Sequence, residues 1–274
     1  MASVFLHLRF LHAYFLMPVY LFALVISPNF TERQLLWSFV IIHLLLYPAS
    51  NGYNRFFSQY TNAVDALKNP PALYFFSILL HAVALALGWL FFNTGFALLI
   101  LIYGLVAIAY SYRGVWLKEY PIVGWLARAL FQGALAFMMC YVGINNYPLA
   151  GLLKAKVLIP AALCALMFVA ICSSMETHLK RGLRGHLFVL ITFLMATITY
   201  LLYFHFYFSD YYGIVFIVAF SPIVLFFLYG VYKYYRTPEA ADYGHTIGFI
   251  FLAATCFNAF FIWMFLRTTN LLQL

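Results

Sequence analysis

Charged residues are scarce in this chain, and acidic residues are the scarcest of them. Only 8% of the 274 residues are charged, whereas a soluble domain carries roughly a quarter. Aspartate and glutamate together number 7, against 15 lysines and arginines, while 66% of the residues are hydrophobic. So few charges cannot cover a water-soluble surface, and the composition therefore favours an integral membrane protein.

Cysteine is also rare, and its spacing does not match the usual disulfide or zinc frameworks. The four cysteines are Cys140, Cys164, Cys172 and Cys256. All of them fall inside or at the ends of apolar segments, and none forms a CxxC pair. We interpret them as small buried hydrophobic residues with no metal or disulfide role.

Long apolar runs dominate what the sequence does contain. A helix that spans a bilayer needs about 20 apolar residues. Hydropathy and turn residues predict spans at 10–27, 35–50, 72–92, 95–112, 122–143, 152–173, 186–208, 211–232 and 245–267. We therefore predict an all-α integral membrane protein, with about nine transmembrane helices in one bundle and a single domain over residues 1–274. The first run is expected to be retained, because no convincing signal-peptide cleavage site follows it.

The basic residues gather on one predicted side of the bilayer. That side carries Arg9, Arg55, Lys68, Arg113, Lys118, Lys180, Arg181, Arg184, Lys233 and Arg236. The opposite side has Arg33, Lys154, Lys156 and Arg267, and Arg128 falls within the fifth span. The positive-inside rule then predicts the cytoplasmic (inner) membrane, a cytoplasmic N-terminus and an external C-terminus. The net charge of +8 thus indicates topology and contact with the lipid bilayer, with no nucleic-acid partner.

Two predicted cytoplasmic loops, 51–71 and 173–185, are longer and more polar than the other connections. Polar side chains at membrane depth must face protein or water, so we expect a cavity that opens to the cytoplasm. At the end of the second span, Asn51, Asn54, Ser58 and Asn62 recur at three- to four-residue spacing, along one side of a continuing helix. This row could bind a polar head group, or it could be a solvated helix end with capping residues.

The segment after the sixth span combines Glu176 with the bases Lys180, Arg181 and Arg184 around Gly182. Basic side chains and a glycine suit a phosphate, and ordinary positive-inside anchoring would give the same pattern.

The fifth span raises a separate question about Arg128. This arginine is expected either to snorkel to the cytoplasmic surface or to pair inside the bundle, with Gln132 as an available neighbour. His43, His81, His205 and Asn258 are isolated polar groups in the spans, and for such histidines hydrogen-bonded packing is favoured over ligand binding.

Two stretches carry a resemblance to a known family. The first runs from Tyr47-Pro48-Ala49-Ser50-Asn51-Gly52-Tyr53-Asn54 to Lys68-Asn69-Pro70-Pro71. The second runs from Tyr110-Ser111 to Lys118-Glu119-Tyr120-Pro121, followed by Gly124-Trp125 and Phe131-Gln132-Gly133. In these stretches and in its nine predicted spans, the chain resembles the UbiA superfamily of intramembrane prenyltransferases. The resemblance implies a bundle in which two Asp-rich motifs hold Mg²⁺, the metal grips a prenyl diphosphate, and an acceptor captures the allylic carbocation.

The chain departs from that family at the aspartates. With Asn54 placed on the first motif's Asn, its Asp positions hold Arg55, Ser58 and Asn62; with Asn51 placed there, they hold Gly52, Arg55 and Gln59. The second motif offers only Glu176, with Cys172 and Lys180 four residues to either side. Mg²⁺ is usually held by carboxylates, so the family's cofactor is expected to lack its ligands here, and no cofactor is predicted with confidence. The bases could instead neutralise a diphosphate without metal.

Two functions stay open on this basis. The chain could bind a prenyl diphosphate in a cytoplasm-facing cavity and transfer the prenyl group to an aromatic or other lipophilic acceptor by an altered, metal-poor site. Alternatively, it could be a catalytically inactive homologue that acts as an isoprenoid- or lipid-binding accessory membrane protein. The candidate diphosphate-binding residues are Asn51, Asn54, Arg55, Ser58, Asn62, Arg113, Lys118, Lys180, Arg181 and Arg184, and the other cavity candidates are Tyr110, Arg128, Gln132 and Glu176.

Overall fold

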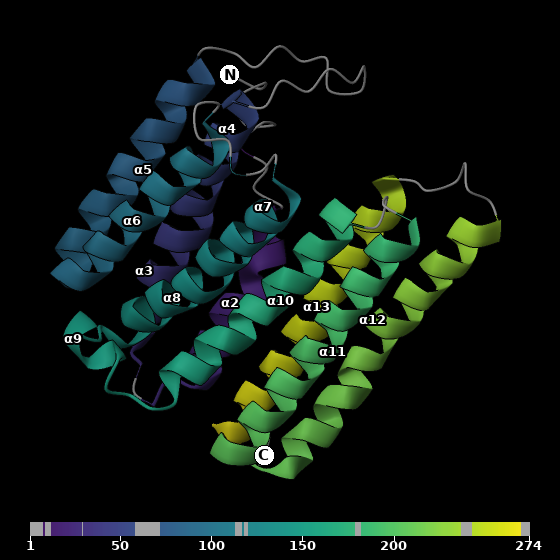
Figure 1. Cartoon of the computed structure of the whole chain (residues 1–274). Helices are drawn as coiled ribbons and strands as arrows, with labels where there is room; N and C mark the ends of the chain where they lie inside the picture. Colours follow the sequence, from purple (N-terminus) through teal and green to yellow (C-terminus); the bar gives the residue numbers. More distant parts are fainter. Residues whose placement is uncertain are drawn as a thin grey trace. The chain divides into compact units, whose positions relative to one another are not determined.

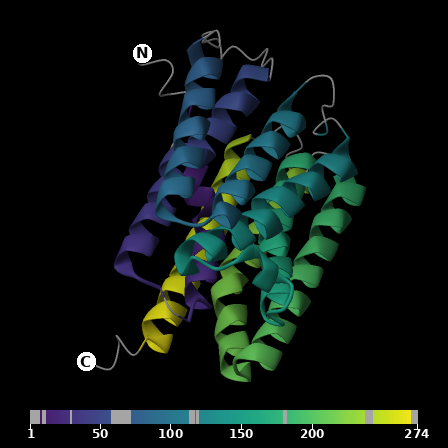
Figure 2. The same cartoon turned by 90° about the vertical axis from the view of Figure 1, so that its left-hand side faces the viewer.

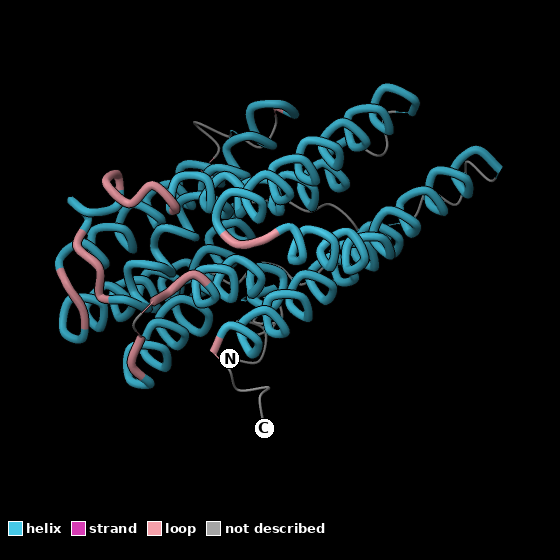
Figure 3. Tube along the Cα trace, turned by 90° about the horizontal axis from the view of Figure 1, so that it is seen from below, coloured by secondary structure: helices cyan, strands magenta, loops and turns pink. Residues whose placement is uncertain are grey.

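The structure is a computed structural model that describes residues 8, 12–28, 30–57, 72–112, 117, 120–178, 182–236 and 243–269. Within these ranges the regular secondary structure is entirely helical (Figure 1). Figure 3 shows the short described loops between the helices, for example at 92–93 and 208–209. The predicted all-α fold class is confirmed.

The described helices agree closely with the predicted spans. Eight are long and apolar enough to cross a membrane: Glu32–Phe57, Ala72–Phe91, Thr94–Ser111, Pro121–Asn145, Leu158–Glu176, Gly182–Tyr207, Asp210–Arg236 and Thr246–Thr268. A ninth apolar helix, α2 (Ala13–Val25), is shorter in its described part and corresponds to the first predicted span.

Two of the spans are composite and contain a π-helical segment in their middle. The first is built from α3 (Glu32–Phe39), η2 (Val40–Leu46) and α4 (Tyr47–Phe57). The second is built from α7 (Pro121–Arg128), η5 (Ala129–Leu135) and α8 (Ala136–Asn145). π-Helical turns are rare and frequently lie at functional sites. Both composite spans carry candidate residues from the sequence.

The chain divides into two compact units. Unit 1 comprises Met1–Leu16, Ser27–Ala127 and Met138–Lys154, and unit 2 comprises Met17–Ile26, Arg128–Phe137 and Ala155–Leu274. The single-domain organisation stays a prediction.

In unit 1, α4 packs against α5 (Ala72–Phe91) and α6 (Thr94–Ser111). Figures 1 and 2 show α5 and α6 side by side. A glycine makes their close contact possible, because a Cβ on Gly104 of α6 would lie 1.5 Å from Cε1 of His81 on α5. The His81 Nε2 atom is 3.2 Å from the carbonyl oxygen of Ile100. The interpretation of His81 as hydrogen-bonded packing is therefore confirmed.

Unit 2 consists chiefly of α10 (Leu158–His178), α11 (Gly182–Tyr207), α12 (Asp210–Arg236) and α13 (Tyr243–Thr268), together with η5. Aromatic rings fill its core. The ring of Phe22 stacks on Phe261 at 4.8 Å, and Tyr200 stacks on Phe216 at 4.7 Å. Stacked and edge-to-face ring pairs stabilise a core beyond the area that they bury.

Candidate functional site

In unit 1, the candidate residues lie on α4 and at the end of α6. Asn51, Asn54 and Arg55 fall within the described helix α4, so their spacing of three and four residues does place them along one side of a helix. Arg55 is only 6% exposed, whereas both asparagines are half-buried. The Asn51 amide nitrogen lies 3.5 Å from the carbonyl oxygen of Leu8, which makes a long and weak hydrogen bond. Tyr110, near the end of α6, is 8% exposed.

The burial of Arg55 matters because an arginine is always charged in proteins and costly to remove from water. A buried guanidinium is tolerated where hydrogen bonds or an anion compensate its charge. Among the described residues of α4 there is no aspartate or glutamate. Arg55 therefore places a buried guanidinium on α4 at a position where the family resemblance would place a carboxylate.

In unit 2, Arg128 and Glu176 form an ion pair and hydrogen bond from Nη1 to Oε2. The two side chains are 22% and 39% exposed, respectively. Arg128 is the last residue of α7, and Glu176 lies in the last turn of α10. Of the two fates expected for Arg128, pairing with a side chain is the one observed, and its partner Glu176 was not anticipated from the sequence.

A close contact between backbones holds the two helices that carry this pair. A Cβ added to Gly133 of η5 would lie 2.5 Å from the Cα atom of Leu166 and 2.8 Å from the carbonyl oxygen of Ala165, both on α10. Only glycine allows η5 and α10 to approach this closely, because the obstacle is backbone and cannot rotate away. Arg128 lies five residues before Gly133 on the same span. The close approach at Gly133 thus positions Arg128 against Glu176. Gln132 is half-buried.

Of the three bases that follow α10, Arg184 is the one that falls within the described residues. It lies in the first turn of α11 and is exposed. Two residues further, His186 is 5% exposed and has ring contacts with Tyr234 at 4.9 Å and Tyr235 at 5.6 Å, both near the end of α12. The remaining candidates lie outside the described residues: Ser58, Asn62, Arg113, Lys118, Lys180 and Arg181.

The donor atoms of the described residues do not fit a Mg²⁺ site of the kind that the resemblance implies. No group of three or more histidine, cysteine, aspartate or glutamate side chains that could hold a metal ion occurs among them. The side chains of α4 contribute only neutral amide and hydroxyl oxygens and a guanidinium, and the Glu176 carboxylate is engaged by Arg128. Hard divalent cations prefer several carboxylate and phosphate oxygens, and the described side chains of the site do not supply a set of carboxylates.

Two solved structures match the chain over 96% of its length. One is a digeranylgeranylglyceryl phosphate synthase in membranes, with a TM-score of 0.64, 14% identity and 98% of that chain covered. The other is a UbiA homologue from Archaeoglobus fulgidus bound to GPP and Mg²⁺, with a TM-score of 0.64, 16% identity and 99% of that chain covered. The chain has the UbiA-type fold. Neither the protein-family models nor the curated proteins give a match by sequence.

The UbiA-type fold confirms the architecture that the resemblance predicted, and it identifies the chain as an integral membrane protein. These comparisons do not test the loss of the acidic motifs at Arg55 and around Glu176, which stays a prediction from the sequence.

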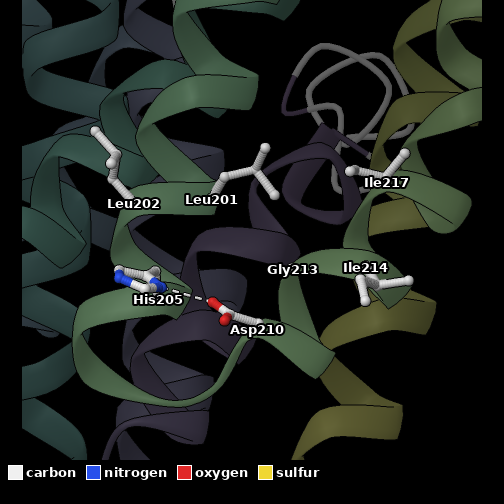
Figure 4. Close-up of a pocket in the computed structure, with 7 residues that line it drawn as sticks. All are labelled: Leu201, Leu202, His205, Asp210, Gly213, Ile214 and Ile217. Atoms are coloured by element: carbon white, nitrogen blue, oxygen red, sulfur yellow. Dashed lines mark hydrogen bonds and ion pairs between the residues drawn. The ribbon is translucent and has the colours of Figure 1, made fainter.

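One site was missed by sequence reasoning. The side chains of His205 and Asp210 lie in a pocket between α11 and α12 and interact with each other at 2.6 Å (Figure 4). His205 is hydrogen-bonded, as was expected of the isolated histidines, but it is exposed and not packed in the bundle.

Proposed function

We propose that this protein binds a prenyl diphosphate and that cationic side chains, instead of Mg²⁺ held by carboxylates, neutralise the diphosphate head. The observation that supports this most directly is the UbiA-type fold, shared with a homologue whose structure holds GPP and Mg²⁺. The replacement of the family's carboxylates supports the proposal that cationic side chains take the place of the metal. A cationic site attracts a diphosphate directly and does not need a metal ion to bridge the protein and the diphosphate.

Each of the two units carries side chains that we propose as contacts of the diphosphate head. In unit 1, Arg55 is a buried cation on α4, with the amides of Asn51 and Asn54 on the same side of the helix. In unit 2, Arg184 is an exposed cation at the start of α11. Arg113, Lys118, Lys180 and Arg181 are proposed on the sequence alone. Guanidinium groups suit this role because they donate two parallel hydrogen bonds to phosphate oxygens.

If the protein is a transferase, the reaction that the resemblance implies is a substitution at the first carbon of the prenyl chain. The bond from that carbon to the diphosphate oxygen breaks, and diphosphate leaves with the electron pair. A nucleophilic atom of a lipophilic acceptor then bonds to the prenyl carbon and loses a proton. Cationic side chains near the diphosphate would favour the first step, because negative charge accumulates on the leaving group.

The alternative is an inactive homologue that retains isoprenoid binding as an accessory membrane protein. The observation that favours it is the ion pair of Arg128 and Glu176. Glu176 is the only acid in the second motif, and a carboxylate engaged by an arginine is a poor metal ligand.

A measurement of diphosphate release distinguishes the transferase from the inactive isoprenoid-binding homologue. Purified protein in detergent or in nanodiscs would be incubated with geranylgeranyl diphosphate and a lipid extract as acceptor source, with and without Mg²⁺, and released diphosphate would be measured. Release that exceeds the rate of a boiled control and requires the acceptor extract identifies a transferase. Tight binding without release in every acceptor mixture identifies the accessory function. Absence of both binding and release contradicts the proposal.

A further inference from the structure

The pocket between α11 and α12 has the form of a groove with one apolar and one polar end. Its volume is about 310 Å³, and it is lined by Leu201, Leu202, His205, Asp210, Gly213, Ile214 and Ile217. Figure 4 shows His205 and Asp210 together at one end, with the leucines and Ile217 further along the two helices. Gly213 leaves the floor of the groove open, because a Cβ there would already lie 3.2 Å from a methyl group of Leu201.

The polar end consists of one hydrogen-bonded pair of side chains, His205 and Asp210, in an exposed position. Nδ1 of His205 lies 2.6 Å from Oδ1 of Asp210, and the two side chains are 59% and 76% exposed. This contact uses Nδ1 of His205 and Oδ1 of Asp210. The second ring nitrogen of His205 and the second carboxylate oxygen of Asp210 have no hydrogen-bond partner among the described residues. The groove therefore presents one acceptor oxygen and one ring nitrogen side by side.

The position of the groove along the helices suits a lipid. α11 ends at Tyr207 and α12 begins at Asp210, so this hydrogen-bonded pair lies at the end of two membrane-spanning helices. Ile217 lies about 10 Å deeper along α12, at 1.5 Å per residue. Leu202, Ile214 and Ile217 are 51%, 63% and 48% exposed, which is expected for side chains that face acyl chains. The apolar part of the groove thus lies below a polar end at the bilayer surface.

We propose that this groove binds one phospholipid with a zwitterionic head that carries a primary amine, of the phosphatidylethanolamine class. The ammonium group donates to the second carboxylate oxygen of Asp210, and an acyl chain follows Leu201 and Ile217. His205 takes part in its imidazolium form, in which Nδ1–H donates to Asp210 and Nε2–H donates to the lipid phosphate. A head with N–H donors next to a phosphate satisfies both partners. A choline head has no N–H group, and a glycerol head brings no cation to Asp210.

This site is separate from the proposed diphosphate contacts in the same unit. Arg184 and His205 lie at opposite ends of α11, about 30 Å apart at 1.5 Å per residue. The groove thus does not restate the proposed function and does not depend on it. The competing interpretation is purely structural: Asp210 lies in the first turn of α12, where a carboxylate stabilises a helix without any ligand.

Native mass spectrometry of the whole protein tests the proposal. The protein, stripped in detergent, would be incubated with an equal mixture of phosphatidylethanolamine, phosphatidylcholine and phosphatidylglycerol with identical acyl chains. We expect the ethanolamine lipid to be retained about tenfold over the choline lipid, because one charge-assisted hydrogen bond distinguishes them. Asp210→Asn should abolish this preference, and Gly213→Leu should reduce retention of every lipid by filling the groove.

Two variants serve as matched controls. Glu32→Gln removes another exposed acid from the first turn of a spanning helix, α3, and should keep the preference. Gly248→Leu changes another glycine within a spanning helix, where the nearest atom to a Cβ is Phe226 Cζ at 3.5 Å. Equal retention of ethanolamine and choline lipids by the unmodified protein overturns the proposal, and so does an undiminished preference in Asp210→Asn. A dimer that depends on Asp210, with no lipid preference, overturns it in favour of a second copy of the chain.

Discussion

Arg128 and Glu176 lie 48 residues apart in the chain and form an ion pair in unit 2. The pair joins the composite span 121–145 to the end of α10, next to the contact of Gly133 with the α10 backbone. It also explains how a charged residue is accommodated within a predicted span, since the arginine is compensated by the single acid of the neighbouring segment. The pair is therefore both an element of stability and the reason why Glu176 is a poor candidate for metal binding.

Breaking either side of this pair should destabilise the protein, and the effects of the two changes should not add up. We expect Glu176→Gln and Arg128→Met each to lower the apparent melting temperature in detergent, and the double variant to be less destabilised than the sum of the two. The coupling should be about 1–2 kcal/mol, within the range for residues of one ion-pair network. Thermal unfolding followed by intrinsic fluorescence measures all four proteins. Additive effects would show that the two side chains do not interact.

Gly133→Ala should also destabilise unit 2, because the added methyl group would meet the backbone of α10 at 2.5–2.9 Å. Overpacking of this kind costs about 1–3 kcal/mol. Gly248→Ala, whose Cβ would make ordinary contact with Phe226 at 3.5 Å, is the matched control and should leave the melting temperature nearly unchanged. Equal behaviour of the two variants would mean that η5 and α10 do not touch as described.

The helices could be predicted well from the sequence because hydropathy is a local property. Each apolar run of bilayer length became a helix, and turn residues such as Asn93-Thr94 fixed the ends of α5 and α6 within a few residues. The π-helical segments η2 and η5 could not be predicted, because their wider hydrogen-bond register is set by packing and not by a local residue pattern.

Two side-chain contacts in unit 2 were not predicted, for two physical reasons. The contact of Arg128 with Glu176 depends on how α10 packs against η5, so nothing near either residue in the sequence indicates it. The contact of His205 with Asp210 depends on the helix break at Phe208 and Ser209, which brings two residues five positions apart together. That break was predicted as a short connection. An acid, Asp210, just after a predicted break and a histidine, His205, just before it were the signal that could have revealed the pair.

The predicted orientation gives a test in cells. With about nine spans and the bases on the cytoplasmic side, a reporter fused before α2 should lie in the cytoplasm and one fused after α13 outside it. An alkaline phosphatase fused after α13 should be active and a fluorescent protein there should be dark. The reverse pattern would contradict the assignment of Arg184 and Arg236 to the cytoplasmic face.

The basic residues at the start of α11 can be tested by substitution. Lys180→Ala combined with Arg184→Ala should weaken binding of geranylgeranyl diphosphate by at least about tenfold, because each charge-assisted contact contributes about 1.5–3 kcal/mol. The matched control is Arg267→Ala. Its guanidinium lies 4.7 Å from the ring centre of Tyr211, beside the first turn of α12 and away from Arg184. Unchanged affinity in the double variant would mean that these bases serve only as topological anchors.

The metal dependence of binding tests the central claim most directly. The dissociation constant of geranylgeranyl diphosphate would be measured for the purified protein in EDTA and in excess Mg²⁺, for the unmodified chain and for Arg55→Ala. A cationic site predicts nearly equal affinity in the two buffers and a loss of about tenfold or more in Arg55→Ala. Binding that requires Mg²⁺ and is indifferent to Arg55→Ala would contradict the account.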